Sequence, residues 1–265
     1  MRPLLAIAAL LLATAAPASA HDFNAGTETT TSGTLAATLA WEAGTAGHGP
    51  QDSRLTITRA GMVAFQQAIP RVCGNDCDRF PGDADDFGFA NLDGTSEPEL
   101  YLDVFNFDRC CETLGVYEAD PATGAYKESV LDWGASMSVE DADHDGRSEI
   151  VTRDTRFTGS LENVQPREVL RYTGGAVHDV TRDFPGVIRS ELGGALEGIR
   201  NLKRSDDLAA AALGTYVADQ YLLGHGAKGL RVLDRQLARG VIGNVKQSGA
   251  YRRTLLAQLH RYGYR

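Results

Sequence analysis

Carboxylates recur at every second position in the segment DADHDGRSEI, residues 141–150. Positions 1, 3, 5, 6 and 9 of this segment are Asp141, Asp143, Asp145, Gly146 and Glu149. Aspartates at this spacing in a loop can direct several oxygens toward one centre, and a glycine permits the sharp turn that this needs. Calcium is a hard cation that takes about six to eight oxygen ligands. The segment therefore predicts a calcium-binding loop.

The second half of the loop distinguishes it from an EF-hand. An EF-hand needs a bidentate glutamate at position 12, but position 12 is Thr152, and the residues around it are strand-like. A second interpretation needs no metal, because aspartates in an Asp-Gly turn also accept hydrogen bonds from nearby backbone amides. Both interpretations place a turn before a strand, and the agreement of five constrained positions favours calcium.

A second copy of the loop lies fifty residues earlier. The segment NLDGTSEPEL, residues 91–100, aligns with residues 141–150 without a gap. Its residues at positions 1, 3, 5 and 9 are Asn91, Asp93, Thr95 and Glu99. Two of the four carboxylates are therefore missing, and Ser96 replaces the glycine at position 6. We expect this degenerate loop to form a turn without a metal.

The two loops resemble the calcium loops of integrin-type FG-GAP repeats and of the VCBS-like repeats common in exported bacterial proteins. The resemblance covers roughly residues 85–160 and implies a propeller-blade-like unit in which the loop links two strands. By position, it implies calcium ligands at Asp141, Asp143, Asp145 and Glu149, together with the backbone carbonyl of Arg147. A propeller typically needs about 4 to 8 blades, so two repeats imply an incomplete or atypical propeller.

The order of the predicted elements gives the fold class. Residues 34–190 contain short strand-like segments separated by glycine- and aspartate-rich turns, a pattern typical of stacked β-meanders. Residues 191–265 are rich in alanine and leucine, with apolar residues at helical spacing. Ser205 or Asp206 could cap a helix that ends before Gly224. The chain is therefore predicted to be mainly β, with a helical C-terminal segment.

The first residues predict export. Residues 1–20 have Arg2, a short apolar run and a small-residue ending, which together are typical of a secretory signal peptide. Residues 21–33 form a polar, threonine-rich lead-in. No later stretch is apolar enough to predict a membrane span. We expect a secreted protein, or one of the periplasm or cell envelope.

Four cysteines are present: Cys73, Cys77, Cys110 and Cys111. An even number in an exported chain favours disulfides, with three pairings open. The adjacent pair at 110 and 111 would be awkward partners for each other, so bridges to the other two are favoured. A zinc site made by all four thiolates is the alternative, although an adjacent pair suits tetrahedral ligation poorly.

Charge is distributed unevenly along the chain, whose net charge is −9. From Arg200 onward there are 12 basic and 4 acidic residues, a net charge of +8, so the preceding residues carry −17. An acidic region attracts cations. The basic helices could contact polyanions of the cell envelope, or they could pack their apolar faces on the β region and expose their charges to water.

The sequence contains no Gly-x-Ser-x-Gly, His-Glu-x-x-His or phosphate-loop motif. Its many carboxylates could provide a glycosidase pair, but no pair is singled out, and the catalytic residues of any enzyme remain unknown. The favoured function is a non-enzymatic, calcium-stabilised β-repeat module for extracellular binding or scaffolding. Its partner would be a protein or polysaccharide, not a nucleic acid. The alternative is a secreted hydrolase that uses acidic residues near a metal.

Overall fold

The structure is a computed structural model, and it describes residues 24–43, 51–69, 87–104, 113–201, 207–243 and 245–265. The predicted signal peptide and all four cysteines lie outside these residues. The predicted disulfides and the alternative zinc site therefore remain predictions.

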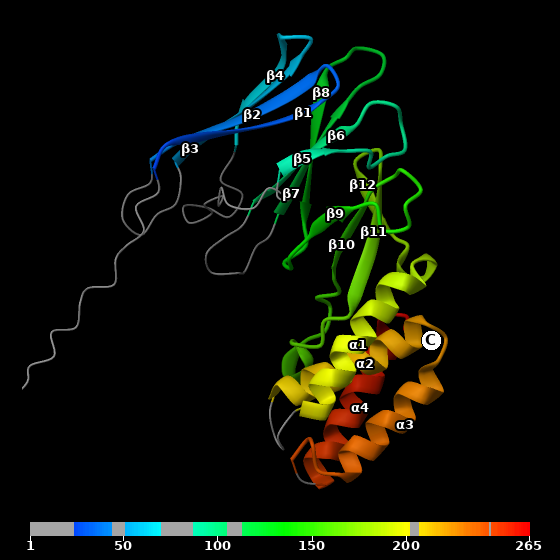
Figure 1. Ribbon diagram of the computed structural model, residues 1–265. Helices are drawn as coiled ribbons and strands as arrows, with labels where there is room; N and C mark the ends of the chain where they lie inside the picture. The colour runs from blue at the N-terminus through cyan, green and yellow to red at the C-terminus, as the bar shows by residue number, and fades with distance from the viewer. Residues whose placement is uncertain (1–23, 44–50, 70–86, 105–112, 202–206, 244) are drawn as a thin grey trace, which may run out of the picture.

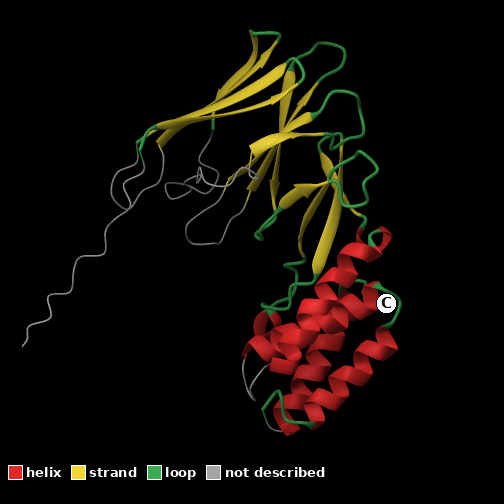
Figure 2. Ribbon diagram, viewed as in Figure 1, coloured by secondary structure: helices red, strands yellow, loops and turns green. Residues whose placement is uncertain are grey.

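Twelve strands in the described residues form three antiparallel sheets of four strands each (Figures 1 and 2). The first sheet contains β1 (Gly26–Ser32), β2 (Leu35–Glu42), β3 (Gln51–Arg59) and β4 (Met62–Ala68). The second contains β5 (Phe87–Ala90), β6 (Glu99–Val104), β7 (Thr113–Ala119) and β8 (Tyr126–Asp132). The third contains β9 (Ser138–Glu140), β10 (Glu149–Arg153), β11 (Arg167–Thr173) and β12 (Ala176–Asp179). In every sheet, strands that are consecutive in sequence are neighbours, so each sheet is a meander.

The second sheet lies between the first and the third and is buried on both faces. Successive side chains of a strand point to opposite sides, so each of its strands contributes to both cores. Leu100 and Leu102 of β6 are fully buried against the first sheet. Tyr101, between them, packs on the core shared with the third sheet. Fully buried residues therefore lie on both sides of the second sheet, which stacks the three sheets in sequence order.

Two separate apolar cores hold this stack together. The core between the first and second sheets contains Ala37, Leu39, Leu55, Ile57, Phe87, Leu100, Leu102 and Tyr117. The core between the second and third sheets contains Leu92, Leu114, Val116, Ile150, Leu170 and Tyr172. Burial of this apolar area is the main source of stability for the stacked sheets.

Four helices follow the sheets: α1 (Pro185–Asn201), α2 (Asp207–Leu222), α3 (Gly226–Ala238) and α4 (Val245–Arg261). They pack around a core of their own that includes Leu213, Val217 and Leu255. The third sheet meets this segment through Phe184, which is buried against Val151 and Val169. The helices therefore continue the stack beyond the third sheet (Figure 1).

The structure confirms a mainly β chain with helices at its C-terminal end. Two boundaries differ from the prediction. Residues 26–32, which the sequence places in a polar lead-in, form strand β1, because β-branched threonines suit a strand and every residue of β1 pairs with β2. Helix begins at Pro185, a few residues before the predicted 191, since proline suits the first turn of a helix.

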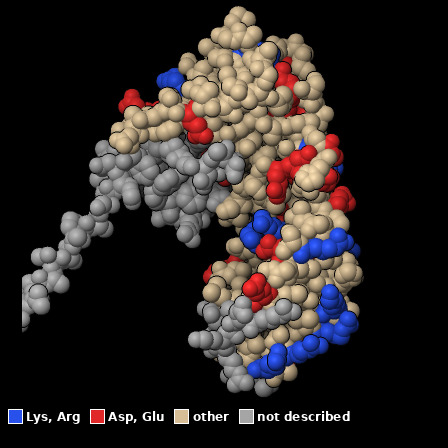
Figure 3. All heavy atoms as spheres, viewed as in Figure 1, with Lys and Arg blue, Asp and Glu red and all other residues tan. Residues whose placement is uncertain are grey.

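The charge asymmetry along the chain is also a separation in space. Figure 3 shows acidic side chains over the sheets and basic side chains gathered over the helices. No helix among the described residues is both long and apolar enough to cross a bilayer.

Candidate metal centre

The two related loops occupy the same place in neighbouring sheets. Residues 91–98 link the first and second strands of the second sheet, and residues 141–148 link the first and second strands of the third sheet. In each loop the residue at position 9 begins the following strand. The sequence repeat is therefore a structural repeat, as the alignment at an offset of fifty predicts.

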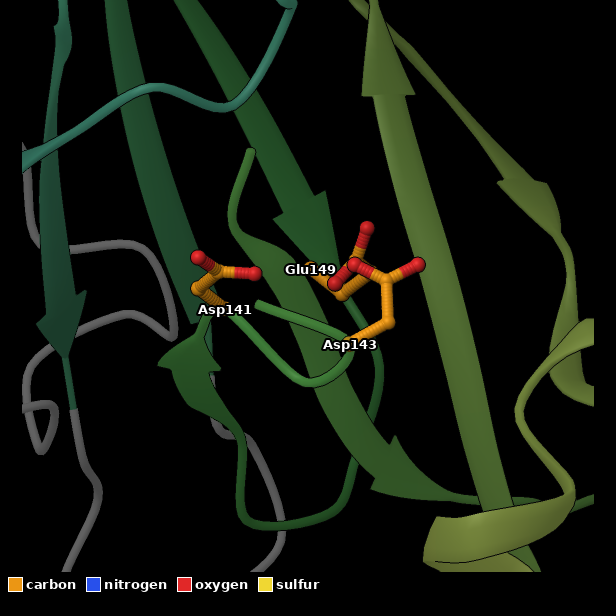
Figure 4. Close-up of side chains that lie close together, drawn as sticks. All are labelled: Asp141, Asp143 and Glu149. Carbon is orange, nitrogen blue, oxygen red and sulfur yellow. The ribbon is translucent and has the colours of Figure 1, made fainter. Parts of the chain in front are cut away.

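Three carboxylates meet in the second loop. Asp141, Asp143 and Glu149 each place an oxygen within 4.8 Å of the others (Figure 4). Asp143 is 41% exposed, whereas Glu149 is fully buried. Among the residues that the structure describes, this is the one group of three or more acidic, histidine or cysteine side chains close enough to share a metal ion.

Backbone amides fix the shape of this loop. Asp141 accepts hydrogen bonds from the amides of Asp145 and Gly146, both at 3.0 Å. Asp145 in turn accepts one from the amide of Arg147 at 2.8 Å. Gly146 has φ +88°, a conformation that other residues seldom adopt. These contacts are the ones expected of an Asp-Gly turn, and they leave further lone pairs on each carboxylate for a cation.

Arg171 of β11 supplies a positive charge to the same place. Its Nε donates to Glu149 Oε1 at 2.9 Å, and its Nη2 lies 3.3 Å from Asp143 Oδ2 and 3.4 Å from Asp145 Oδ2. The hydrogen bond to Glu149 is the main cause that raises the pKa of Arg171. The guanidinium also lies over the ring of Phe184, 5.3 Å from its centre. Arg171 thus connects the loop to the residues that lead into α1.

The charge balance of the loop fits a divalent cation. Arg171 pairs with the carboxylates of residues 143, 145 and 149, and the carboxylate of Asp141 lies beside two of them, so these four carboxylates and one guanidinium carry a formal net charge of −3. Every potential metal ligand in the group is a carboxylate oxygen, the ligand type that calcium and magnesium prefer. A bound dication would relieve the remaining repulsion, sharing the carboxylates with Arg171 or displacing it.

The first loop is closed by its own hydrogen bonds. Asn91 Oδ1 accepts from the amide of Gly94 at 2.9 Å, and Thr95 donates its hydroxyl to the carbonyl of Glu97. Asp93 accepts from the amide of Thr95 at 2.6 Å. The residues that replace the missing carboxylates therefore hold the turn themselves.

Buried glutamates play the same part in both loops. Glu149 Oε2 accepts from the amide of Ala142, at position 2 of its loop, at 3.2 Å. Glu99 Oε2 accepts from the equivalent amide of Leu92 at 2.7 Å. Burial is the main cause that raises the pKa of Glu99 to about 7. Position 9 therefore fastens the start of the loop to the following strand, with or without a metal.

The two loops also contact each other. Asn91 donates its side-chain amide to the carbonyl of Gly146 at 3.0 Å, and its own carbonyl accepts from the amide of Ser148. Arg147 donates Nε to the carbonyl of Leu92 at 2.9 Å and Nη2 to that of Tyr172 at 2.6 Å. The side chain of Arg147 thus ties neighbouring sheets together.

The structure therefore brings together three of the predicted ligands. Asp145 is not one of these three, and it accepts a hydrogen bond from Arg171. The fifth predicted ligand is the backbone carbonyl of Arg147, whereas the contacts described for this residue are those of its side chain and its backbone amide. The loop motif did not single out Arg171, which lies 22 residues beyond Glu149. Its apolar neighbours Leu170 and Tyr172 suit a strand, but nothing in the motif indicates that this strand meets the loop.

A pocket of about 380 Å³ adjoins the first loop. Its walls include Arg59 and five acidic residues: Asp93, Glu97, Glu99, Glu118 and Asp120. Arg59 forms an ion pair with Glu97 and lies 5.8 Å from the centre of the Tyr126 ring. Asp141, Asp143 and Glu149 do not line this pocket. The carboxylate group of the second loop and the pocket are thus separate features.

One exposed histidine in the second loop adopts a left-handed conformation. His144, at position 4, has φ +61°, and the equivalent residue in the first loop is Gly94 with φ +84°. We expect His144→Gly to raise the free energy of unfolding by about 0.5–1 kcal/mol, because it removes a steric cost that exceeds the added entropy of the unfolded chain. Urea unfolding would measure this. The reciprocal variant Gly94→Ala should be destabilising, and equal effects of one sign would contradict the explanation.

Comparison with known proteins adds no relative: no family model, no curated protein and no solved structure matches this chain.

Proposed function

We propose that this protein is an exported, non-enzymatic β-repeat module, stabilised by calcium, that serves in binding or scaffolding outside the cell. The observation that carries the proposal is the convergence of Asp141, Asp143 and Glu149 within 4.8 Å. The three stacked meanders, two of them with a related loop between their first and second strands, support propeller-blade-like units of the FG-GAP or VCBS kind.

Calcium in this module would be structural. It would neutralise carboxylates at the end of a loop whose residue Glu149 is buried beside the core of the third sheet. The loop amides and Arg171 already hold the turn, so a metal would add to stability without being the sole support of the fold. Calcium sites of extracellular modules bind weakly, with Kd on the order of 10⁻⁴–10⁻³ M.

The position of the pocket favours the non-enzymatic proposal over a hydrolase. A catalytic metal keeps an open coordination position in a pocket where the substrate binds. Here the pocket of about 380 Å³ is lined by the first loop, whose position-1 and position-5 carboxylates are replaced by Asn91 and Thr95. The loop that would hold calcium contributes none of the residues that line it.

Thermal melting with and without calcium tests the proposal. At about 10 mM calcium, binding with the Kd given above adds about 1.4–2.7 kcal/mol, which raises the Tm by about 3–10 °C. We expect Asp143→Ala to abolish this rise, because it removes one of the three carboxylates that converge on the site. Titration calorimetry should show the same loss of binding.

The first loop offers a matched control. Asp93→Ala removes the equivalent residue at position 3 and the equivalent hydrogen bond to the amide two residues later. It should leave the calcium-dependent rise in Tm intact. An equal rise in the Asp143→Ala variant, or in wild type with sodium chloride at the same ionic strength, would show that the loop is only a turn.

A further inference from the structure

A row of basic side chains lies along one face of α3. Lys228, Arg231 and Arg235 of α3 and Arg239, which directly follows the helix in αR conformation, are three or four residues apart, which places them on one side of the helix. All four are exposed. Eleven residues of helix correspond to about 16 Å, so a positive charge occurs roughly every 5 Å along this row.

The neighbouring helix reinforces this charge. No acidic residue occurs in α4, and its exposed residues include Lys246, Arg253 and Arg261. The one acidic residue in α3 is Asp234, which is paired with Arg252 at 2.7 Å. Residues 226–265 therefore carry nine basic residues against one acidic residue, a net charge of +8. In Figure 3, basic side chains run along the edge of the helical segment where α3 lies in Figure 1.

Several acidic side chains of the sheets already have basic partners. Asp143, Asp145 and Glu149 share Arg171, and Glu97 pairs with Arg59. Burial acts to raise the pKa of Glu191 in α1, but the hydrogen bonds and charges of Arg153 and Arg167 together lower it. In contrast, no described residue forms a recorded ion pair with the four basic residues of the α3 row. These paired carboxylates on a second copy are thus less available to the row than the oxygens of an external polyanion.

The character of the surface also argues against a lipid bilayer. Binding at a membrane surface usually adds buried apolar side chains to the basic ones. The exposed large apolar residues among those described are Met62, Val63, Val130 and Leu208, and none of them lies on α3 or α4. The apolar faces of these helices are used inside, where Leu233, Leu255 and Leu259 are buried.

We propose that the basic row on α3 binds a linear polymer of phosphates that carries no bases, such as inorganic polyphosphate. Three of its four cations are arginines, whose planar guanidinium groups can donate two parallel hydrogen bonds to the oxygens of one phosphate. A polymer of phosphates repeats a permanent charge along its length, as the row does along the helix. This surface is separate from the calcium loop, so the proposal stands independently of the metal.

Binding to inorganic polyphosphate chains of defined length tests this inference. Fluorescence anisotropy of labelled polyphosphate at low salt should show saturable binding by the full chain. Since exposed charge pairs each contribute modestly, Arg231→Gln with Arg235→Gln should weaken binding about tenfold. Raising the salt from 50 to 200 mM should weaken wild-type binding about 50-fold if four phosphates are contacted.

A matched pair of substitutions controls for total charge. Lys127→Gln with Arg189→Gln removes two exposed cations on β8 and α1 and should leave the affinity unchanged. Equal weakening by both pairs, or no saturable binding of polyphosphate, would overturn the proposal. So would tighter binding to anionic lipid vesicles or single-stranded nucleic acid, or self-association that salt and the α3 substitutions abolish.

Discussion

Replacing Glu149 with alanine should lower the free energy of unfolding by about 3 kcal/mol in calcium-free buffer. This side chain is fully buried and has two partners. Its Oε1 accepts from Arg171 at 2.9 Å, and its Oε2 accepts from the amide of Ala142 at 3.2 Å. Removing it leaves a partly buried guanidinium and a loop amide without this acceptor, and breaking a buried charge pair from one side costs about 3–5 kcal/mol. Urea unfolding followed by circular dichroism would measure the change.

Two variants separate this effect from a general loss of charge. Glu149→Gln keeps the shape and one oxygen acceptor, so its cost should be smaller. Glu140 lies directly opposite Glu149 on β9 and is exposed, so Glu140→Ala should change stability by less than about 0.5 kcal/mol. Similar small losses in Glu149→Ala and Glu140→Ala would mean that the buried contacts of Glu149 contribute little.

The contact that Glu149 makes with the loop amide is present in both copies of the repeat. Position 9 is a glutamate in both loops, and in both it is buried and accepts a hydrogen bond from the amide at position 2. Positions 1 and 5 carry an aspartate in the second loop only, whereas this contact is present in both. The glutamate therefore defines the loop as a structural unit, and the aspartates determine whether it has the charge to bind a cation.

Much of this organisation follows from sequence pattern. The strand-rich region predicted over residues 34–190 contains β2 to β12, and apolar spacing predicted the helix that became α2. The repeat at an offset of fifty predicted two equivalent loops. These features are local, so the sequence pattern that predicts each of them lies in the residues that form it.

What the sequence did not predict depends on pairing between distant segments. Strands β5 and β9 have only four and three residues, too short for a clear alternation. The polar strand β1 depends on its partner β2, which supplies the buried side of the pair. Arg171 reaches the loop because β10 and β11 are adjacent in the third sheet. Such contacts depend on which strands pair and in which register, and neither can be predicted from one short segment of the sequence.

An isolated carboxyl group in the helical segment gives the second large expected effect. Asp219 of α2 is fully buried, and neither of its carboxyl oxygens has a hydrogen-bond partner among the described residues. Burial is the main cause that raises the pKa of Asp219 to about 8; the charge of Glu191 acts in the same direction, and the charges of Arg153 and Arg167 oppose it. At neutral pH this group is therefore mostly protonated in the folded protein and ionised in the unfolded chain.

The sign of the pH effect follows from this difference. Between pH 4 and pH 8 the folded state binds a proton at Asp219 that the unfolded chain has lost, so rising pH lowers the free energy of unfolding. The contribution is complete below about pH 4 and is lost by about pH 8. Glu168, whose pKa burial raises to about 7, contributes a slope of the same sign.

We therefore expect Asp219→Asn to be more stable than wild type by about 5 kcal/mol at pH 8 and by only about 1 kcal/mol at pH 4.5. Asparagine keeps the size of the protonated side chain and cannot ionise, so the difference between the two proteins isolates this one group. Urea unfolding across the pH range would measure it. Asp234→Asn, at an exposed ion pair with Arg252, should show no such gain. A constant difference between Asp219→Asn and wild type at every pH would mean that the carboxyl at 219 ionises normally and has found a partner or water in solution.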